Sequence, residues 1–538
     1  MAGLSFQQIE RIRLVNTWKK RLALRLNMRA LTTGVLLAAF FIALLALVQF
    51  ATPDLASTDD YYHIKLAQLM RTDGLKPAFP WLPLTILNAQ EFYDHHFLFH
   101  VGLIPFTVGD LVQGAKWASV LFASLAFFSV WWLLHSQRVP YDWLWALGLL
   151  AVSSAFLFRM SMTRAQSLAL ALMVIALYLL FSRRYAWLLP LSFLFVWLYD
   201  AFPLILVITG IYVLSVGLIE RRLEFRPLVY AGLGVGLGML INPYFPDNII
   251  FTYRHIFPKV TEATSVRVGN EWFPYRTATL LKNSPLGLVA FISGGLALGL
   301  QVRRMDTRTL TSFLAAVFFG LLLLQSRRFI EYFPPFALIF AAFAWAPLLA
   351  GQHGSDPPGK LALPGSGSAP VHTGIWPRWQ AGLPATVLGL LVLAGMVYTL
   401  PDAQKLMQSA KPDQRYAKVA AWLARNTPAG ERIFQTDWDD FPRLFFHNTH
   451  NTYLLGLDPT YMQLFDPDLY DQWVEITQGD VRRPSAAIVS LFNTNYVMSD
   501  LNHQDFIDQA EADPAMQLVY RDDEAVVFRI QDEQILIP

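Results

Sequence analysis

The sequence predicts a polytopic α-helical membrane protein that ends in a small soluble α/β domain. Hydrophobic residues make up 54% of the 538 residues and charged residues only 15%, whereas a soluble protein usually has about 25% charged residues. The hydrophobic residues collect in runs of about 20, the length that a helix needs to cross a bilayer. From about residue 401 these runs give way to short amphipathic patterns.

The first predicted span covers residues 31–50 and follows a basic segment, residues 1–30. Because positive charge next to a span stays in the cytoplasm, we expect a cytoplasmic N-terminus. The apolar run is longer than a signal-peptide core, so it is interpreted as an anchor.

A long first external loop, 51–113, follows, with surface helices predicted around 60–72 and 88–107. A second long external loop is expected at 246–285. Ten further spans are predicted, at 116–135, 141–158, 165–182, 186–200, 202–219, 228–245, 286–302, 309–325, 333–349 and 381–400. The loops that this topology places inside are rich in arginine, as the positive-inside rule requires. About eleven spans therefore form a transmembrane domain over residues 1–400.

Residues 351–378 are rich in Gly, Pro and Ser and predict a flexible cytoplasmic linker. Residues 401–538 predict an external α/β domain. An amphipathic helix is expected at 415–426. Short β-rich runs predict strands at 432–435, 496–499, 518–521 and 525–530.

Several function classes are disfavoured by composition and by the placement of charge. The chain has no cysteine, which excludes a thiolate metal site and a cysteine nucleophile. The basic residues lie in short loops between spans, so no nucleic-acid partner is expected. Few ionisable residues fall in the middle of spans, where ion-coupled transporters usually keep them. The acids gather in external loops instead, which favours chemistry at the membrane surface.

The first external loop carries Asp59-Asp60-Tyr61-Tyr62-His63, in which two acids, two aromatic residues and a histidine are consecutive. Carboxylates can bind a hard divalent cation, and such a cation can neutralise a departing phosphate. The pattern also fits an ordinary helix start, with Ser57 or Thr58 as the cap and acids in the first turn. Both interpretations stay open at this point.

Two further external segments carry candidate ligands. Asp94-His95-His96 offers up to three metal ligands, although adjacent helical histidines point about 100° apart and seldom share an ion. An interfacial histidine pair is the alternative. Glu271 lies beside Trp272 in the loop 246–285, which is long enough to act as a lid. A solvated acid within an aromatic belt is the alternative there.

Basic residues at two external turns run against the positive-inside rule. Arg327 and Arg328 follow the span 309–325, and Arg159 and Arg164 flank the turn after 141–158. Such residues predict an anionic ligand at the external face, for example a lipid phosphate or diphosphate. Snorkelling toward headgroups is the alternative. Because two separate turns show the pattern, the ligand is favoured.

Together these residues resemble the membrane glycosyltransferases of the GT-C superfamily, and within it the oligosaccharyltransferase catalytic-subunit (STT3-like) branch. Asp59-Asp60-Tyr61-Tyr62-His63 is similar to the family's first-loop element, in which Asp59 matches the metal-binding aspartate. Glu271 is similar to the acid of the family's mobile loop. The segment Asp437-Trp438-Asp439-Asp440-Phe441 lies where the family has its Trp-Trp-Asp-Tyr-Gly acceptor motif.

The resemblance implies an enzyme that transfers a sugar or glycan from a polyprenyl-phosphate or diphosphate carrier to an external acceptor, which is a glycan, lipid or protein. It implies a divalent cation, Mg²⁺ or Mn²⁺. The roles that fit the resemblance are catalysis by Asp59, Asp60 and Glu271, metal binding by Asp59 and Glu271, donor-phosphate binding by Arg327 and Arg328, and acceptor binding by Trp438, Asp439 and Asp440. The residue patterns above add Asp94 and His96 as candidate metal ligands and Arg159 and Arg164 as candidate phosphate ligands.

The sequence departs from the family pattern at two places. In the turn after the third span, Arg159-Met160-Ser161-Met162-Thr163-Arg164 replaces an acidic motif and removes one expected metal ligand. Asp94, His96 and Asp200 are the candidate replacements. The acceptor segment lacks the second tryptophan and the glycine.

Two other functions stay open, a transporter or flippase for lipid-linked glycans and a non-catalytic assembly factor for envelope glycans. In each case the expected location is a bacterial inner membrane or archaeal plasma membrane, with the C-terminal domain outside, in the periplasm of a bacterium. Membrane lipids are therefore expected partners.

Overall fold

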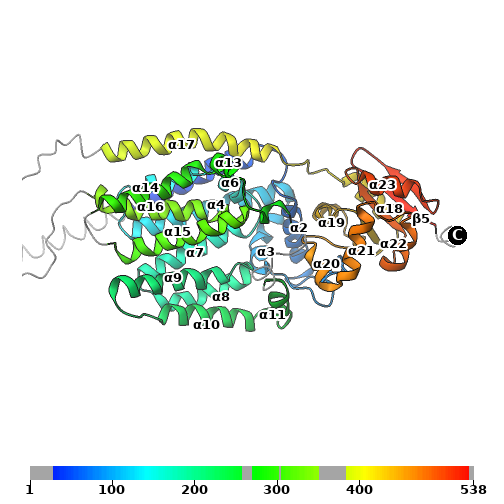
Figure 1. Ribbon diagram of the computed structural model, residues 1–538, viewed down its shortest axis with the longest axis horizontal. Helices are drawn as coiled ribbons and strands as arrows, with labels where there is room; N and C mark the ends of the chain where they lie inside the picture. The colour runs from blue at the N-terminus through cyan, green and yellow to red at the C-terminus, as the bar shows by residue number, and fades with distance from the viewer. Residues whose placement is uncertain (1–27, 29, 257–268, 302–304, 351–382, 532–538) are drawn as a thin grey trace, which may run out of the picture.

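A computed structural model of the chain describes residues 28, 30–256, 269–301, 305–350 and 383–531. A long helical part occupies one end of the molecule, and a smaller domain with a β-sheet occupies the other (Figure 1). The segment 51–113, predicted as the first external loop and called by that name below, lies between them. The predictions for the basic segment before residue 28 and for the linker 351–378 fall outside the described residues.

Five described helices are long and apolar enough to cross a membrane, or up to seven if two bent pairs each count as one span. The five are Ala30–Gln49, α4 (Leu111–Ser136), α9 (Pro203–Glu220), α15 (Thr307–Gln325) and α17 (Leu383–Gln408). In the first bent pair α5 (Asp142–Leu147) and η2 (Gly148–Leu150) meet α6 (Ser154–Met160) at 85°, and in the second α13 (Thr277–Asn283) meets α14 (Pro285–Leu300) at 86°.

The remaining apolar helices of this part are shorter. They are α3 (Phe97–Leu103) with η1 (Ile104–Thr107), α7 (Gln166–Phe181), η3 (Tyr185–Trp187) with α8 (Leu188–Leu198), α10 (Arg226–Leu240) and α16 (Phe333–Leu349). A helix thus occupies each predicted span position, and the multi-pass helical class agrees with the prediction. The total of about eleven spans is not confirmed, because several of these helices are too short to cross alone.

The two bends are bonded to each other. Ser153 Oγ accepts a hydrogen bond from the Phe156 amide, which caps α6, and donates to the Asn283 carbonyl at 2.7 Å. The Gly287 amide donates to the Val152 carbonyl at 3.0 Å. Backbone groups freed by each bend therefore find partners at the other. These bonds hold α6, which carries Arg159 near its end, beside the residues that follow Glu271 in the chain.

The first external loop contains α2 (Thr58–Asp73), which confirms the predicted helix at 60–72. The predicted helix at 88–107 is only partly present, since helix begins at Phe97. In the preceding turns Asn88 Oδ1 accepts from the amides of Gln90 and Glu91. Asp94 Oδ1 likewise accepts from the His96 amide. Such side-chain bonds to the backbone compete with helix formation.

The C-terminal domain contains a five-stranded sheet with the order β2-β1-β3-β5-β4. β1 pairs in parallel with β2 and β3, whereas β5 pairs antiparallel with β3 and β4. The strands are β1 (Arg432–Gln435), β2 (Thr452–Tyr453), β3 (Tyr496–Asp500), β4 (Met516–Arg521) and β5 (Ala525–Ile530). The helices are α18 (Ala417–Asn426), η8 (Trp438–Asp440), α19 (Phe441–His447), α20 (Thr460–Phe465), α21 (Pro467–Thr477), α22 (Ser485–Phe492) and α23 (Gln504–Glu511).

The four predicted strands and the first predicted helix are present with small shifts at their ends. β2 and the five α-helices after α18 were not predicted. β2 is only two residues long, too short to show an alternating pattern.

The sheet domain is anchored to the first external loop by a shared apolar core. Tyr62 and Trp81 of the loop pack with Phe445 and Tyr453 of the sheet domain. The Tyr453 amide donates to the Trp81 carbonyl at 2.8 Å, so the loop extends the edge of the sheet. α17 runs past the predicted boundary at residue 400 to Gln408. The division at 400 stays a prediction.

Candidate active site

The candidate site forms around the N-terminus of α2, which Asp60 fastens to a neighbouring turn. Asp60 Oδ2 accepts from the Ser57 amide at 3.1 Å, as in a capping box. Its other oxygen accepts from the Thr163 amide at 3.0 Å. Because both oxygens bond backbone amides, Asp60 is a positioning residue. It holds the turn that carries Arg164 against the start of α2.

Asp59, on the exposed side of the same helical turn, pairs with Arg164. Arg164 Nη2 donates to Asp59 Oδ2 at 2.6 Å and to Ser57 Oγ at 2.8 Å. The Asp59 side chain is 25% exposed, so solvent still reaches this carboxylate. The distance is typical of a strong charge-assisted bond.

Arg159, at the end of α6, joins two carboxylates that are far away in the sequence. Its Nε donates to Glu331 Oε1 at 2.8 Å, and Nη2 donates to the same oxygen. Its Nη1 donates to Glu271 Oε2 at 2.6 Å. Glu331 is the last residue of η6 (Arg327–Glu331) and its side chain is 1% exposed. The guanidinium therefore bridges η6 and the loop of Glu271.

Glu271, in η5 (Asn270–Trp272), forms ion pairs with two more arginines. Arg164 Nη1 lies 3.5 Å from Glu271 Oε2, and Arg328 Nη1 lies 3.4 Å from Glu271 Oε1. The loop is also held through its backbone, because Ser326 Oγ donates to the Glu271 carbonyl and the Arg327 amide donates to the Phe273 carbonyl. We call Asp59, Arg159, Arg164, Glu271, Arg328 and Glu331 the ionic network.

Arg327 and Arg328 differ in what they touch. Arg328 donates to the Tyr199 hydroxyl and lies 5.0 Å from the centre of the Trp272 ring, within the ionic network. Arg327 donates to the Pro274 carbonyl at an exposed position. Only Arg328 is therefore placed with the carboxylates.

The sheet domain contributes Asp439 to the edge of this network. Thr58 Oγ1, one residue before Asp59, donates to Asp439 Oδ2 at 3.4 Å. Trp438 is half-buried against the core of the sheet domain. Asp440 is buried and belongs to a different group of acids. Of the three predicted acceptor-binding residues, Asp439 faces α2.

Burial and charge move the pKa values of these acids in opposite directions. Burial raises the pKa of Asp60 to about 7. Burial, followed by the charge of Asp59, raises the pKa of Asp439 to about 7. Burial also raises the pKa of Asp59, against the lowering effect of Arg164. Burial disfavours ionisation of Glu271 too, but Arg159, Arg328 and Arg164 outweigh it and hold that pKa below its usual value. Glu271 is thus a permanent anion.

Asp94 and His96 lie in a separate histidine cluster, which we define as His63, Asp94, His96 and His100. Both Asp94 oxygens lie within 2.9 Å of His100 Nδ1, and His100 Nε2 lies 2.7 Å from His63 Nδ1. The His96 ring packs on His63 and Tyr199. Burial lowers the pKa of His63 and His96 well below the usual value, so both rings are neutral.

Among the described residues, the group compact enough to hold a metal ion is Asp437, Asp440 and Asp500, with ligand atoms within 4.8 Å of one another. We call it the carboxylate group. It lies in the sheet domain, and His503 and Asn502 bond to Asp500. The predicted set Asp59, Asp94, His96 and Glu271 does not form such a group in the described part of the chain.

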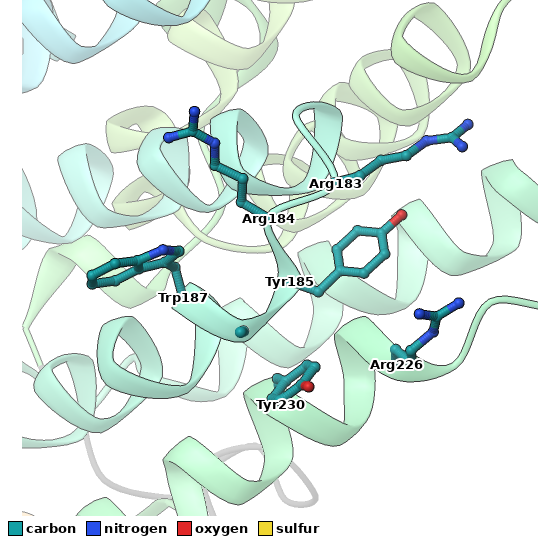
Figure 2. A pocket seen from close by; sticks show the side chains of 7 residues that line it. Arg183, Arg184, Tyr185, Trp187, Arg226 and Tyr230 are labelled. Atoms are coloured by element: carbon teal, nitrogen blue, oxygen red, sulfur yellow. The ribbon is translucent and has the colours of Figure 1, made fainter.

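A second set of arginines lies one helix length away, where α7 ends. Arg183, Arg184 and Arg226 line a pocket of about 400 Å³ together with Tyr185, Ala186, Trp187 and Tyr230. In Figure 2 the Arg184 side chain extends away from those of Arg183 and Arg226. Arg183 pairs with Glu220, and Arg226 pairs with Glu224. We call this the basic pocket.

The structure adds residues that the sequence did not assign to the site. Glu331 follows Arg328 by three residues, just after the predicted span 309–325. Its closeness in sequence to a predicted site residue could have identified it as a candidate. Thr58 and Tyr199 carry no such signal, because their contacts join distant segments. Buried atoms without a partner among the described residues include Arg164 Nε and Glu331 Oε2. One is a donor and the other an acceptor, which suits a ligand that carries both kinds of group.

No protein-family model matches the sequence, and the comparison with curated proteins gave no match. Solved structures do resemble the fold. The oligosaccharyltransferase AglB from Archaeoglobus fulgidus, in complex with an inhibitory peptide and a dolichol-phosphate, aligns with a TM-score of 0.59 and 13% identity over 93% of this chain and 75% of that chain.

Two further structures extend this likeness. The Archaeoglobus fulgidus oligosaccharyltransferase complexed with Zn and sulfate has a TM-score of 0.57 and 13% identity, over 93% of this chain and 74% of that chain. ArnT from Cupriavidus metallidurans bound to undecaprenyl phosphate has a TM-score of 0.53 and 15% identity, over 93% and 98%. These proteins are GT-C glycosyltransferases, and the chain shares their fold over most of its length.

Proposed function

We propose that this protein is an integral membrane glycosyltransferase of the GT-C type. It moves a sugar or glycan from a polyprenyl-phosphate or diphosphate carrier to an acceptor at the external face. The observation that supports this most is the ionic network, because three arginines and three carboxylates from distant segments converge where the helical part meets the sheet domain. The similar structures bound to dolichol-phosphate and undecaprenyl phosphate support a carrier of this kind.

The groups of the network suit transfer of a sugar from a phosphate. An acceptor hydroxyl attacks the anomeric carbon, the bond from that carbon to the phosphate oxygen breaks, and the phosphate leaves with the electron pair. Asp59 accepts the proton of the hydroxyl, since its carboxylate is partly exposed and burial raises its pKa toward that of an effective base. Arg164 and Arg328 donate to the phosphate oxygens as negative charge develops.

The loop of Glu271 and the sheet domain complete the site in this proposal. Glu271 keeps Arg159, Arg164 and Arg328 oriented toward one place, so that they are preorganised before the donor arrives. Trp438 and Asp439 bind the acceptor, because Asp439 is held beside Asp59 by Thr58. The protein lies in a bacterial inner membrane or archaeal plasma membrane, with the sheet domain outside.

The test follows label from polyprenyl-linked sugars in membranes that contain the protein. Wild type should release label from the carrier to an acceptor fraction, and Asp59→Asn should lose this release. Asp73→Asn, at an exposed position near the end of α2, is the matched control and should behave as wild type. Label that stays on an intact carrier and changes leaflet would contradict transfer and indicate a flippase. Label that neither leaves the carrier nor moves would indicate an assembly factor.

A further inference from the structure

The similarity to oligosaccharyltransferases implies a divalent cation at the site, and one similar structure contains zinc. Carboxylate oxygens with free lone pairs are what such an ion needs. Here one oxygen of each of the two carboxylates matched to that role is already bound closely by a guanidinium group. Arg164 Nη2 lies 2.6 Å from Asp59 Oδ2, and Arg159 Nη1 lies 2.6 Å from Glu271 Oε2. The residues therefore do not fit the expected metal site.

The charge of the network also disfavours a divalent cation. Asp59, Glu271 and Glu331 supply three negative charges, and Arg159, Arg164 and Arg328 supply three positive charges. A second cation placed beside Glu271 would lie within a few ångströms of the guanidinium groups that already touch it. Repulsion between like charges at such distances is strong where burial limits solvent screening.

The other carboxylates near Asp59 and Glu271 do not supply the missing metal ligands. Both Asp60 oxygens accept backbone amides. Asp94 holds His100 in the histidine cluster. The buried free oxygen of Glu331 belongs to a side chain whose other oxygen is bonded by Arg159. In the described part of the chain, no third acid joins Asp59 and Glu271 in a compact group.

We propose that Arg159 and Arg164 take the place of the divalent cation, so that sugar transfer at this site is independent of added metal. This rests on the proposed function. Arg164 links Asp59 to Glu271 as a bridging cation would, and Arg159 ties Glu271 to Glu331. The buried Nε of Arg164 has no partner among the described residues and is available to a phosphate oxygen. The departing phosphate therefore meets N–H donors, which stabilise it as a metal clamp does in other enzymes.

The first test is turnover of the labelled donor in membranes treated with excess EDTA and then resupplied with Mg²⁺ or Mn²⁺. We expect the rate to stay within about twofold of the untreated rate and the added ions to have no larger effect, because no step uses a metal. A loss of tenfold or more that either ion restores would overturn the inference while leaving the proposed transferase activity intact.

A second test does not depend on activity, and it examines the premise of the inference, that the ionic network binds no divalent cation, even if no donor is turned over. The purified protein is titrated with Mn²⁺ and bound ion is measured by electron paramagnetic resonance, with Asp59→Asn and Asp500→Asn for comparison. We expect the wild-type protein and Asp59→Asn to bind the same amount of Mn²⁺. Mn²⁺ that Asp500→Asn removes and Asp59→Asn keeps belongs to the carboxylate group, so the ionic network would then bind none, as the inference expects. Mn²⁺ lost in Asp59→Asn and kept in Asp500→Asn would overturn it.

Discussion

The ionic network and the basic pocket are both rich in arginine, yet their arginines are held in opposite ways. In the network the partners are 57 to 172 residues apart, and the side chain of Arg159 is 10% exposed. In the basic pocket Arg226 pairs with Glu224, two residues away, and its side chain is 74% exposed. Long-range buried pairs must be built by the fold, whereas local exposed pairs form wherever the sequence places them.

This contrast shows which arginines carry functional information. Arg159 is buried and Arg164 and Arg328 are half-buried, and such arginines are costly unless carboxylates pair with them. We therefore interpret these three, which come from distant segments, as the candidate ligands of an anionic group. Exposed arginines at helix ends are what the positive-inside rule requires of any cytoplasmic loop. The ionic network and the basic pocket both contain arginines. They differ in how deeply the arginines are buried and in how far away in the sequence the partner carboxylates lie.

The largest effect is expected from matched alanine substitutions in the two groups. Arg164→Ala should lower turnover of the labelled donor about 10²- to 10³-fold, because it removes a donor that faces developing charge. Arg184→Ala should leave turnover within about twofold of wild type, because that residue lies in the exposed pocket. Initial rates in membranes with equal amounts of protein measure both. Equal losses in the two variants would contradict the claim that the ionic network, and not the basic pocket, binds the donor.

The next effect concerns stability. Arg159→Leu leaves Glu331 buried without its partner, which should cost roughly 3–5 kcal/mol. Adding Glu331→Gln to Arg159→Leu should recover most of that loss, because no unpaired charge remains. Thermal unfolding of the detergent-solubilised variants gives the comparison. If the double variant is no more stable than Arg159→Leu, the pair is not what stabilises this junction.

A smaller effect is expected from pH at the contact between α2 and the sheet domain. The pKa of Asp439 is about 7 in the folded protein and about 3.9 when unfolded. The folded state then binds the proton more tightly, so stability from this group is full below pH 4 and is lost as the pH rises to about 7. Asp439→Asn should make the decline in melting temperature between pH 4 and pH 7 shallower, whereas the control Asp73→Asn should follow wild type.

The smallest effect is expected in the basic pocket itself. Glu220→Gln weakens the pairs with Arg183 and Arg222, whose side chains are 57% and 40% exposed, while an amide oxygen can still accept from Thr307 Oγ1. Exposed pairs contribute only about 0.2–1 kcal/mol each. Thermal unfolding should therefore change little, and the small difference should shrink further in high salt. A loss as large as that of Arg159→Leu would mean that the pocket is a built structure like the network.

Much of the fold could be predicted from the sequence because long apolar runs and β-rich runs are local patterns. The helix at 60–72 could be predicted from another local pattern, a cap at Ser57 or Thr58 followed by acids in the first turn. The bends at Ser153 and Asn283 could not, because they depend on hydrogen bonds between segments 130 residues apart. Among the described residues the candidate spans by length are fewer than the predicted eleven, because several apolar helices are shorter than 18 residues.

The site was predicted residue by residue but not as an arrangement. Asp59, Glu271, Arg159, Arg164 and Arg328 were all selected for their positions in external segments. The sequence could not show that the arginines bind the acids, since each pair joins segments more than 50 residues apart. Nor could it show that Asp94 is engaged by His100, because their six-residue spacing is not a metal-binding pattern.

The most direct test of the account is a structure by cryo-electron microscopy of the protein in lipid nanodiscs with undecaprenyl phosphate. We expect the phosphate to lie within hydrogen-bond distance of the guanidinium groups of Arg164 and Arg328, beside Asp59. A phosphate in the basic pocket at Arg184, with the ionic network unchanged and closed to the carrier, would contradict the central claim that the network is the donor site.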